Sequence, residues 1–312
     1  SPDLSAWELF ELVETDDVRA ACDLFLPVHE RSKGVDGYVS IEVSPGAAHS
    51  VDDTIAEARR LWAVVARPNV MIKVPGTPAG AASARRLLAD GINVNITLLF
   101  SVAAYAGIIE SYLAALEERA SRGLPLNTLA SVASFFVSRV DTETEKRLDA
   151  LVAANPSRAE EAKAFRGRIA VANAKLAYAL FRERFSGARW EALAARGARV
   201  QRPLWASTST KNPAYRDVLY VEDLIGPDTV NTMPPATITA FADHGTVERT
   251  VDLGLEQERA LVARLETAGI SLADVTDALL RDGLASFARS FDSLIAGLEA
   301  KRRTLDATVA AR

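Results

Sequence analysis

The sequence predicts an α/β fold of the (β/α)8-barrel type, built from parallel strands joined by helices. Short apolar runs of strand character alternate with longer helical patterns along the 312 residues. Several of these runs alternate polar with apolar side chains, as expected where helices cover the apolar side of each strand and the polar side lines an interior. No repeat, low-complexity tract or long polar linker interrupts the pattern, so residues 1–312 are predicted to form a single domain, with extra helices from about 254 to 312.

Six segments have the composition of strands, with β-branched and aromatic residues between turn residues. They span 37–44, 70–75, 93–100, 129–138, 202–207 and 229–233. A closed barrel of this type needs eight strands. The sequence therefore predicts either an open sheet or two further strands upstream of Ser1.

Helical patterns occupy the intervals between these strands and most of the C-terminal part. They span 1–33, 51–66, 77–90, 101–120, 142–185, 213–224 and nearly all of the chain after Met233, with turns at Gly245 and Gly269. Ser50 and Ser101 are candidate N-caps, and the pattern in 142–185 is expected to break near Asn155-Pro156.

Composition excludes several classes of function. The net charge of −5 gives no general attraction to nucleic acid or to anionic membranes. Cys22 is the only cysteine, so neither an intrachain disulfide nor a metal site built on paired cysteines is expected, and the three histidines lack metal-ligand spacing. No nucleotide-binding glycine motif, signal peptide or apolar run of ~18 residues occurs, so we expect no nucleotide cofactor, no membrane segment and a cytoplasmic location.

Polar residues follow one side of the predicted strands. Glu42, Asn95, Thr97 and Ser134 lie on strands 37–44, 93–100 and 129–138, and Lys73 interrupts the apolar run 70–75. Barrel enzymes carry their catalytic groups at the carboxyl ends of the strands. We therefore expect these side chains to converge at one end of the barrel interior.

The opposite, apolar side of each strand should pack against the helices. In strand 37–44 that side carries Ile41 and Val43, whereas Ser40 and Glu42 are on the interior side. The same rule applied to strand 229–233 places Asn231 in the interior and Val230 against the helices.

Lys73 has two interpretations. It could form a buried ion pair with Glu42 on the preceding strand. Alternatively, burial disfavours the charged form of an amine, so Lys73 could act as a Schiff-base nucleophile, with Glu42 as a general base through a water molecule. Asn95 and Thr97 could hold substrate hydroxyls or that water, or could only satisfy each other's hydrogen bonds.

Two basic residues after strands are candidates for binding a phosphate. Arg139 follows "SFFVS", and Lys211 lies in the hydroxyl-rich loop "STSTKNP". The alternative is that Arg139 pairs with Asp141 and that Lys211 is solvated.

Taken together, these motifs resemble the transaldolase family, and the matching stretches cover most of the chain in the family's order. They are "DGYVSIEVSP" (36–45), "RPNVMIKVPGT" (67–77), "GINVNITLLFS" (91–101), "SVASFFVSRVD" (131–141), "RPLWASTSTKNPAYRDVLYVEDLIGPDTVNTMPP" (202–235) and "LLRDGLASFARSFDSLIAGL" (279–298). The longer bacterial subgroup, with lysine in the "STSTKNP" loop, is the most similar.

The resemblance implies a class I aldolase-like barrel that moves a dihydroxyacetone unit between phosphosugars in the pentose phosphate pathway, without a cofactor. Lys73 would form the Schiff base, and Glu42 and Thr97 would position the catalytic water. The resemblance assigns the remaining substrate contacts to Asn95 for hydroxyls, to Ser134, Arg139 and Lys211 for the phosphate, and to Phe136 for the pocket wall. A homo-oligomer is compatible with this interpretation.

The chain departs from the family at its beginning. The family's first strand ends in an acid/base aspartate and its second carries a Thr-Ser-Asn-Pro turn, and neither motif occurs here. Because "GYVSIEVS" resembles the third strand, the six strands are expected to be family strands three to eight. The chain is then expected to begin after the second strand and to be weakly active or inactive. Two alternatives are an aldolase that releases dihydroxyacetone and a non-catalytic phosphosugar-binding remnant.

Overall fold

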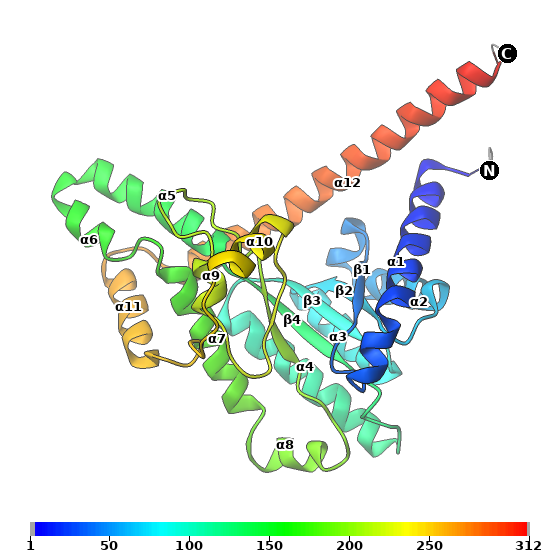
Figure 1. The fold of residues 1–312 in the computed structure, drawn as a ribbon, viewed down its shortest axis with the longest axis horizontal. Coiled ribbons are helices and arrows are strands. Elements are labelled where there is room, and N and C mark those ends of the chain that lie inside the picture. Colours follow the sequence, from blue (N-terminus) through cyan, green and yellow to red (C-terminus); the bar gives the residue numbers. More distant parts are fainter. Residues whose placement is uncertain (1–3, 311–312) are drawn as a thin grey trace.

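The computed structural model describes the backbone of residues 4–310 and the side chains of residues 4–304. Its strands form one parallel sheet in chain order. They are β1 (Val39–Glu42), β2 (Val70–Pro75), β3 (Val94–Leu99), β4 (Ser131–Phe136), β5 (Arg202–Ala206) and β6 (Val230–Asn231). Within the described residues β1 and β6 are the two edges, so the sheet is an open, curled half-barrel (Figure 1). The predicted six-strand α/β architecture is confirmed.

The helices follow the predicted intervals, with more breaks than expected. They are α1 (Ala6–Arg31), η1 (Pro45–His49), α2 (Val51–Val65), α3 (Pro78–Asp90), α4 (Val102–Ser121), α5 (Ser138–Ala154), η2 (Pro156–Arg158), α6 (Ala159–Lys163), α7 (Ile169–Arg184), α8 (Gly187–Ala194), α9 (Leu219–Glu222), α10 (Pro235–His244), α11 (Leu255–Thr267) and α12 (Leu272–Ala310). The break at Asn155-Pro156 is confirmed. The ends of the predicted domain, residues 1–3 and 311–312, lie outside the described residues.

Local signals in the sequence define several helix ends. Ser50, Thr77 and Ser101 cap the N-termini of α2, α3 and α4, because each side chain accepts a hydrogen bond from the backbone N–H of the third residue of its helix. Gly91 ends α3 with a φ of 94°, a left-handed conformation that favours glycine. The end of α3 at Gly91 therefore fixes where the chain turns into β3.

The main core lies between the sheet and the helices that cover its convex side. Ile72 and Val74 of β2 and Val94 and Ile96 of β3 are fully buried there, against residues of α2, α3, α4 and α7. The other side of the sheet carries a second, smaller apolar cluster of Met71, Ala130, Val132, Leu204 and Ala206. The interior is therefore polar mainly along β1–β3 and apolar along β4–β6.

The prediction for the last strand is wrong. Val230 pairs with Leu204 in the smaller, interior cluster, and Asn231 pairs with Trp205 on the helix side. Asn231 is tolerated there because its side-chain oxygen accepts a hydrogen bond from Thr208 Oγ1 at 2.8 Å. With only two residues in β6, the alternation of polarity carries too little information to assign its faces.

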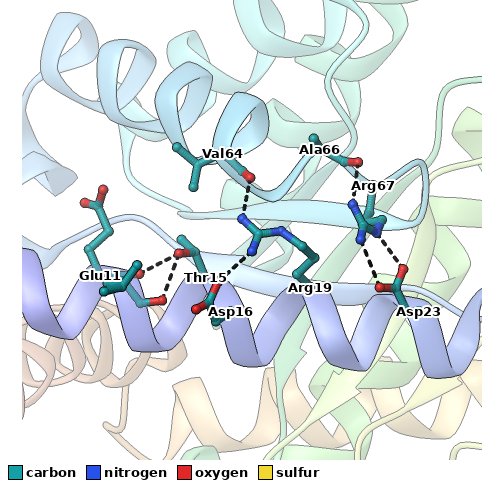
Figure 2. A network of polar contacts seen from close by, with 9 residues as sticks. Glu11, Thr15, Asp16, Arg19, Asp23, Val64, Ala66 and Arg67 are labelled. Carbon is teal, nitrogen blue, oxygen red and sulfur yellow. Dashed lines mark hydrogen bonds and ion pairs between the residues drawn. The ribbon is translucent and has the colours of Figure 1, made fainter.

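Helix α1 is anchored beside β1 by charged groups (Figure 2). Arg19 donates to the carbonyl oxygen of Val64 at 2.9 Å, and Arg67 binds both carboxylate oxygens of Asp23, at 2.5 and 2.9 Å. The bidentate geometry is the stronger of these contacts because both hydrogen bonds are charge-assisted. These contacts fix α1 against the end of α2.

No helix among residues 4–310 is both long and apolar enough to cross a membrane.

Candidate active site

The predicted polar side chains converge at the carboxyl ends of the first four strands. The sheet register places Glu42 beside Lys73 and Lys73 beside Asn95. These three side chains, with Thr97 and Ser134, line one cavity of about 860 Å³ on the concave side of the sheet. The predicted convergence is confirmed.

Lys73 forms an ion pair with Glu42. The Nζ atom lies 3.1 Å from Oε2, and 28% of the lysine side chain and 25% of the glutamate side chain are exposed. The prediction of the pair is confirmed, but the expectation of a buried ammonium group is wrong because Lys73 faces the cavity. A molecule in the cavity can therefore reach the amine, and Glu42 can accept the proton that the amine must lose before it attacks a carbonyl.

Asn95 is held by two hydroxyl groups. Its amide nitrogen donates to Ser40 Oγ at 3.0 Å, and its amide oxygen accepts from Ser134 Oγ at 2.7 Å. Because Asn95 and Ser134 are almost fully buried, these bonds fix the orientation of the amide. One N–H and one lone pair of the amide are left for a ligand.

Strand β3 has an irregularity where it reaches the site. Its pairing with β4 shifts between Ile96 and Leu99, and Leu98 has a φ of 57°. Such a bulge turns a side chain away from strict alternation. Thr97, just before it, is buried at the cavity wall, and no described residue makes a hydrogen bond to its hydroxyl group. That hydroxyl is available to a water molecule or a substrate.

Arg139 and Phe136 form the next wall. The guanidinium carbon of Arg139 lies 5.0 Å from the centre of the Phe136 ring. Both line a smaller cavity of about 220 Å³ that also touches Glu42, Lys73 and Thr97. Arg139 therefore provides a positive charge on the rim of the site.

The alternative pairing of Arg139 with Asp141 is wrong. Asp141 is buried and accepts hydrogen bonds from the backbone N–H of Ala170 and the hydroxyl of Tyr220, both at 2.8 Å. Burial raises the pKa of Asp141 to about 7. Among the described residues Arg139 has no carboxylate partner, so its charge is available to an anionic ligand.

Lys211 lies apart from these residues. It is exposed, donates to Ser209 Oγ at 2.7 Å, and lines neither cavity described above. Its loop is tied to α5, because Tyr215 and Asn212 both donate to the carboxylate of Glu145. The structure therefore brings together all the predicted site residues except Lys211.

Comparisons with known proteins agree with this geometry. The family model described as Transaldolase/Fructose-6-phosphate aldolase matches residues 3–298. The chain belongs to this family. It is 45% identical to the transaldolase of Trichodesmium erythraeum (strain IMS101), over 96% of this chain and 80% of that protein. It is 48% identical to the transaldolase of Thermobifida fusca (strain YX), over 94% and 78%, and 50% identical to that of Mycobacterium marinum (strain ATCC BAA-535 / M), over 95% and 77%.

Two parts of this transaldolase-family site were not predicted. Glu14 of α1 lines the larger cavity, and its pKa is raised to about 7, first by burial and then by the charges of Glu11 and other nearby glutamates. Ser286, Phe287 and Ser290 of α12 line the smaller cavity. Neither strand alternation nor residue type marks helix residues that reach a site through tertiary packing.

In the described residues no group of three or more histidine, cysteine, aspartate or glutamate side chains could hold a metal ion.

Proposed function

We propose that this protein is a transaldolase that transfers a dihydroxyacetone unit through a Schiff base on Lys73. The donor would be fructose 6-phosphate or sedoheptulose 7-phosphate, and the acceptor glyceraldehyde 3-phosphate or erythrose 4-phosphate. The observation that carries the proposal is the cavity-facing amine of Lys73 with Glu42 at 3.1 Å, in a chain that matches the family over residues 3–298.

The chemistry uses the lysine as both nucleophile and electron acceptor. Lys73 Nζ, after giving a proton to Glu42, attacks the ketose carbonyl at C2, and water leaves to form a protonated imine. Loss of the C4 hydroxyl proton breaks the C3–C4 bond, the electron pair moves toward the imine nitrogen, and an aldose phosphate departs. The enamine carbon then attacks the aldehyde of the acceptor, and water hydrolyses the new imine to free Lys73.

The neighbouring residues have distinct proposed roles. Glu42 and Thr97 would position the water molecule that carries protons, since the carboxylate and the unpaired hydroxyl line the same cavity. Asn95 would bind substrate hydroxyls with its remaining N–H, and Ser134 would fix its orientation. This role for Ser134 replaces a direct phosphate contact, because its hydroxyl already donates to Asn95.

The phosphate group is proposed to bind Arg139, with Phe136 as the wall beside it. Lys211 is a weaker candidate because its amine points to Ser209 in a loop outside both cavities. A role for Lys211 would require its loop to move toward the site. Comparing Lys211→Ala with Arg139→Ala separates the two: only a rise in KM for both variants would support both residues.

The test of the proposal is borohydride trapping with fructose 6-phosphate, followed by peptide mass spectrometry. We expect a reduced adduct on Lys73 in the wild type and in Lys146→Met, a change of an exposed lysine on α5. Lys73→Met should give no adduct. Absence of an adduct in the wild type, or an adduct on another lysine, would refute the role of Lys73.

Release of dihydroxyacetone without transfer is the second candidate function, because the family description includes fructose-6-phosphate aldolase. In both reactions water finally hydrolyses an imine on Lys73, and they differ in whether the enamine carbon first takes up a proton or attacks the aldehyde of an aldose phosphate. Product formation from fructose 6-phosphate should therefore be measured with and without erythrose 4-phosphate. A transaldolase needs the acceptor for sustained turnover, whereas an aldolase does not.

We further propose that the six strands correspond to strands three to eight of an eight-stranded barrel. The support is their parallel, consecutive order and the position of Lys73 on β2 with Glu42 on β1. In a barrel with this correspondence, the two remaining strands would lie between β6 and β1.

A further inference from the structure

Helix α12 passes over the end of the sheet where the candidate active site lies. It contacts β3, and it also contacts α5 and η1, which follow the carboxyl ends of β4 and β1. Figure 1 shows it running from the region of α10 toward the N-terminal helix α1. One stretch of α12 therefore lies beside the carboxyl ends of the strands, where the candidate active site is.

The close approach of α12 depends on two unusual residues. Leu98 is turned out of the β3 alternation by its φ of 57°, just after Thr97. A side chain on Gly283 would place its Cβ 3.2 Å from Leu98 Cδ2, which is tighter than ordinary van der Waals contact. The bulge and the glycine together let α12 pack directly on the rim of the site.

Residues one turn further along α12 then face the site. Ser286, Phe287 and Ser290 line the cavity of about 220 Å³ whose other walls are Lys73, Arg139 and their neighbours. The spacing of Gly283, Ser286, Phe287 and Ser290 places them on one face of the helix. The same face thus contacts Leu98 and closes the cavity.

The charged groups of this cavity leave a net positive charge for an anion, because Glu42, its one carboxylate, is paired with Lys73 and Arg139 adds a second cation. Ser286 and Ser290 are exposed, and no described residue makes a hydrogen bond to either hydroxyl. Arg139 lines the same cavity and has no carboxylate partner among the described residues. A guanidinium group and two hydroxyl donors around one space provide the donors that phosphate oxygens require.

We propose that Ser286 and Ser290 of α12 bind the phosphate group of the sugar substrate together with Arg139, so that the C-terminal helix forms part of the substrate site. Phe287 closes the apolar side of the same space. The inference rests on the proposed function for the identity of the substrate, but it concerns binding and not the chemical step. It can therefore be tested without turnover.

The test measures binding of glucitol 6-phosphate by calorimetry, because this alcohol has the phosphate but no carbonyl with which to form an imine. Ser286→Ala/Ser290→Ala should bind it about 10-fold more weakly than the wild type, since hydrogen bonds to a charged group are lost. Ser293→Ala is the matched control on the same helix, and it lines neither cavity. It should bind like the wild type. Glucitol, which lacks phosphate, should bind all three proteins equally.

In the alanine double variant, water molecules could replace the lost hydroxyl groups as donors to the phosphate, so a second variant is needed. Ser286→Glu places a carboxylate where the phosphate would lie, so like-charge repulsion should abolish binding, whereas Ser293→Glu should bind normally. Thermal unfolding of each variant checks that the fold is intact. Equal affinity of the alanine double variant and the wild type, or no binding by the wild type, would overturn the inference. An adduct on Lys73 with unchanged phosphate affinity would overturn it and leave the proposed function intact.

Discussion

At the scale of single residues, the ion pair of Lys73 and Glu42 is the arrangement on which the proposed Schiff-base mechanism depends. The 3.1 Å separation lets Glu42 hold the amine in place and take its proton. Glu42→Gln keeps the shape but removes the charge, so we expect kcat to fall about 10² to 10⁴-fold. Borohydride trapping should still label Lys73, but more slowly. Glu191→Gln, an exposed glutamate on α8, is the control and should have wild-type kcat.

Wild-type kcat in Glu42→Gln would show that the pair is structural, which is the simpler of the two interpretations of Lys73. Loss of both activity and folding would be uninformative for catalysis, so the unfolding transition must be measured alongside. Because both side chains are about a quarter exposed, replacing the glutamate with its amide should not unfold the protein.

Asp141 is the residue whose ionisation should be visible in stability. Its folded-state pKa is about 7, raised by burial, whereas an unfolded aspartate has a pKa near 3.9. Between these values the folded state binds more protons than the unfolded state, so stability falls as pH rises from about 4 to about 7. The slope from this residue is at most about 1.4 kcal/mol per pH unit.

Asp141→Asn should remove that part of the slope, since an amide does not titrate but can still accept a hydrogen bond from Ala170 or Tyr220. Urea unfolding of both proteins at several pH values between 4 and 8 measures the difference. The comparison between the two proteins is necessary because the pKa of Glu14 is also about 7 and contributes a slope of the same sign in both. Parallel stability curves would contradict the assignment.

At the scale of elements, two glycines of α12 offer a matched pair. A Cβ at Gly283 would contact Leu98, whereas a Cβ at Gly297 would meet nothing within 4 Å. Gly297→Leu should stabilise the protein by about 0.5–1 kcal/mol, because leucine has the higher helix propensity. Gly283→Leu should instead displace α12 from the rim and raise KM for fructose 6-phosphate. Urea unfolding and steady-state kinetics check both, and equal KM values would show that the position of α12 is irrelevant to binding.

The elements also show which features local sequence determines. Strands β2 and β3 were predicted to within a residue or two, because β-branched runs and helix caps such as Ser101 are local signals. The convergence of Glu42, Lys73 and Asn95 followed from the parallel register. The faces of β6 were predicted wrongly, because the hydrogen bond between Thr208 and Asn231 is tertiary. The contribution of α12 depends on the bulge at Leu98, which no composition signal marks.

At the scale of the whole molecule, the described sheet has two open edges and a concave side with a cavity of about 860 Å³. An edge strand leaves backbone N–H and C=O groups without strand partners, and an open interior admits water to the imine. Under the proposed correspondence to barrel strands three to eight, an extended chain in which two further family strands pair with β1 and β6 should be more active than residues 1–312 alone.

We expect kcat/KM of the extended chain to rise at least about 10²-fold, which is the rate increase that a positioned general acid or base typically contributes. The control extension has the same strands with the acid/base aspartate replaced by asparagine. This control separates closure of the barrel from the chemistry of the aspartate. Closure of the barrel alone would restore substrate binding and stability but would raise kcat only a little. If the extended chain and the present one have equal kcat/KM, the six strands and Glu42 are sufficient for the reaction. In that case Glu14, whose carboxyl group lines the same cavity, becomes the residue to test as the acid.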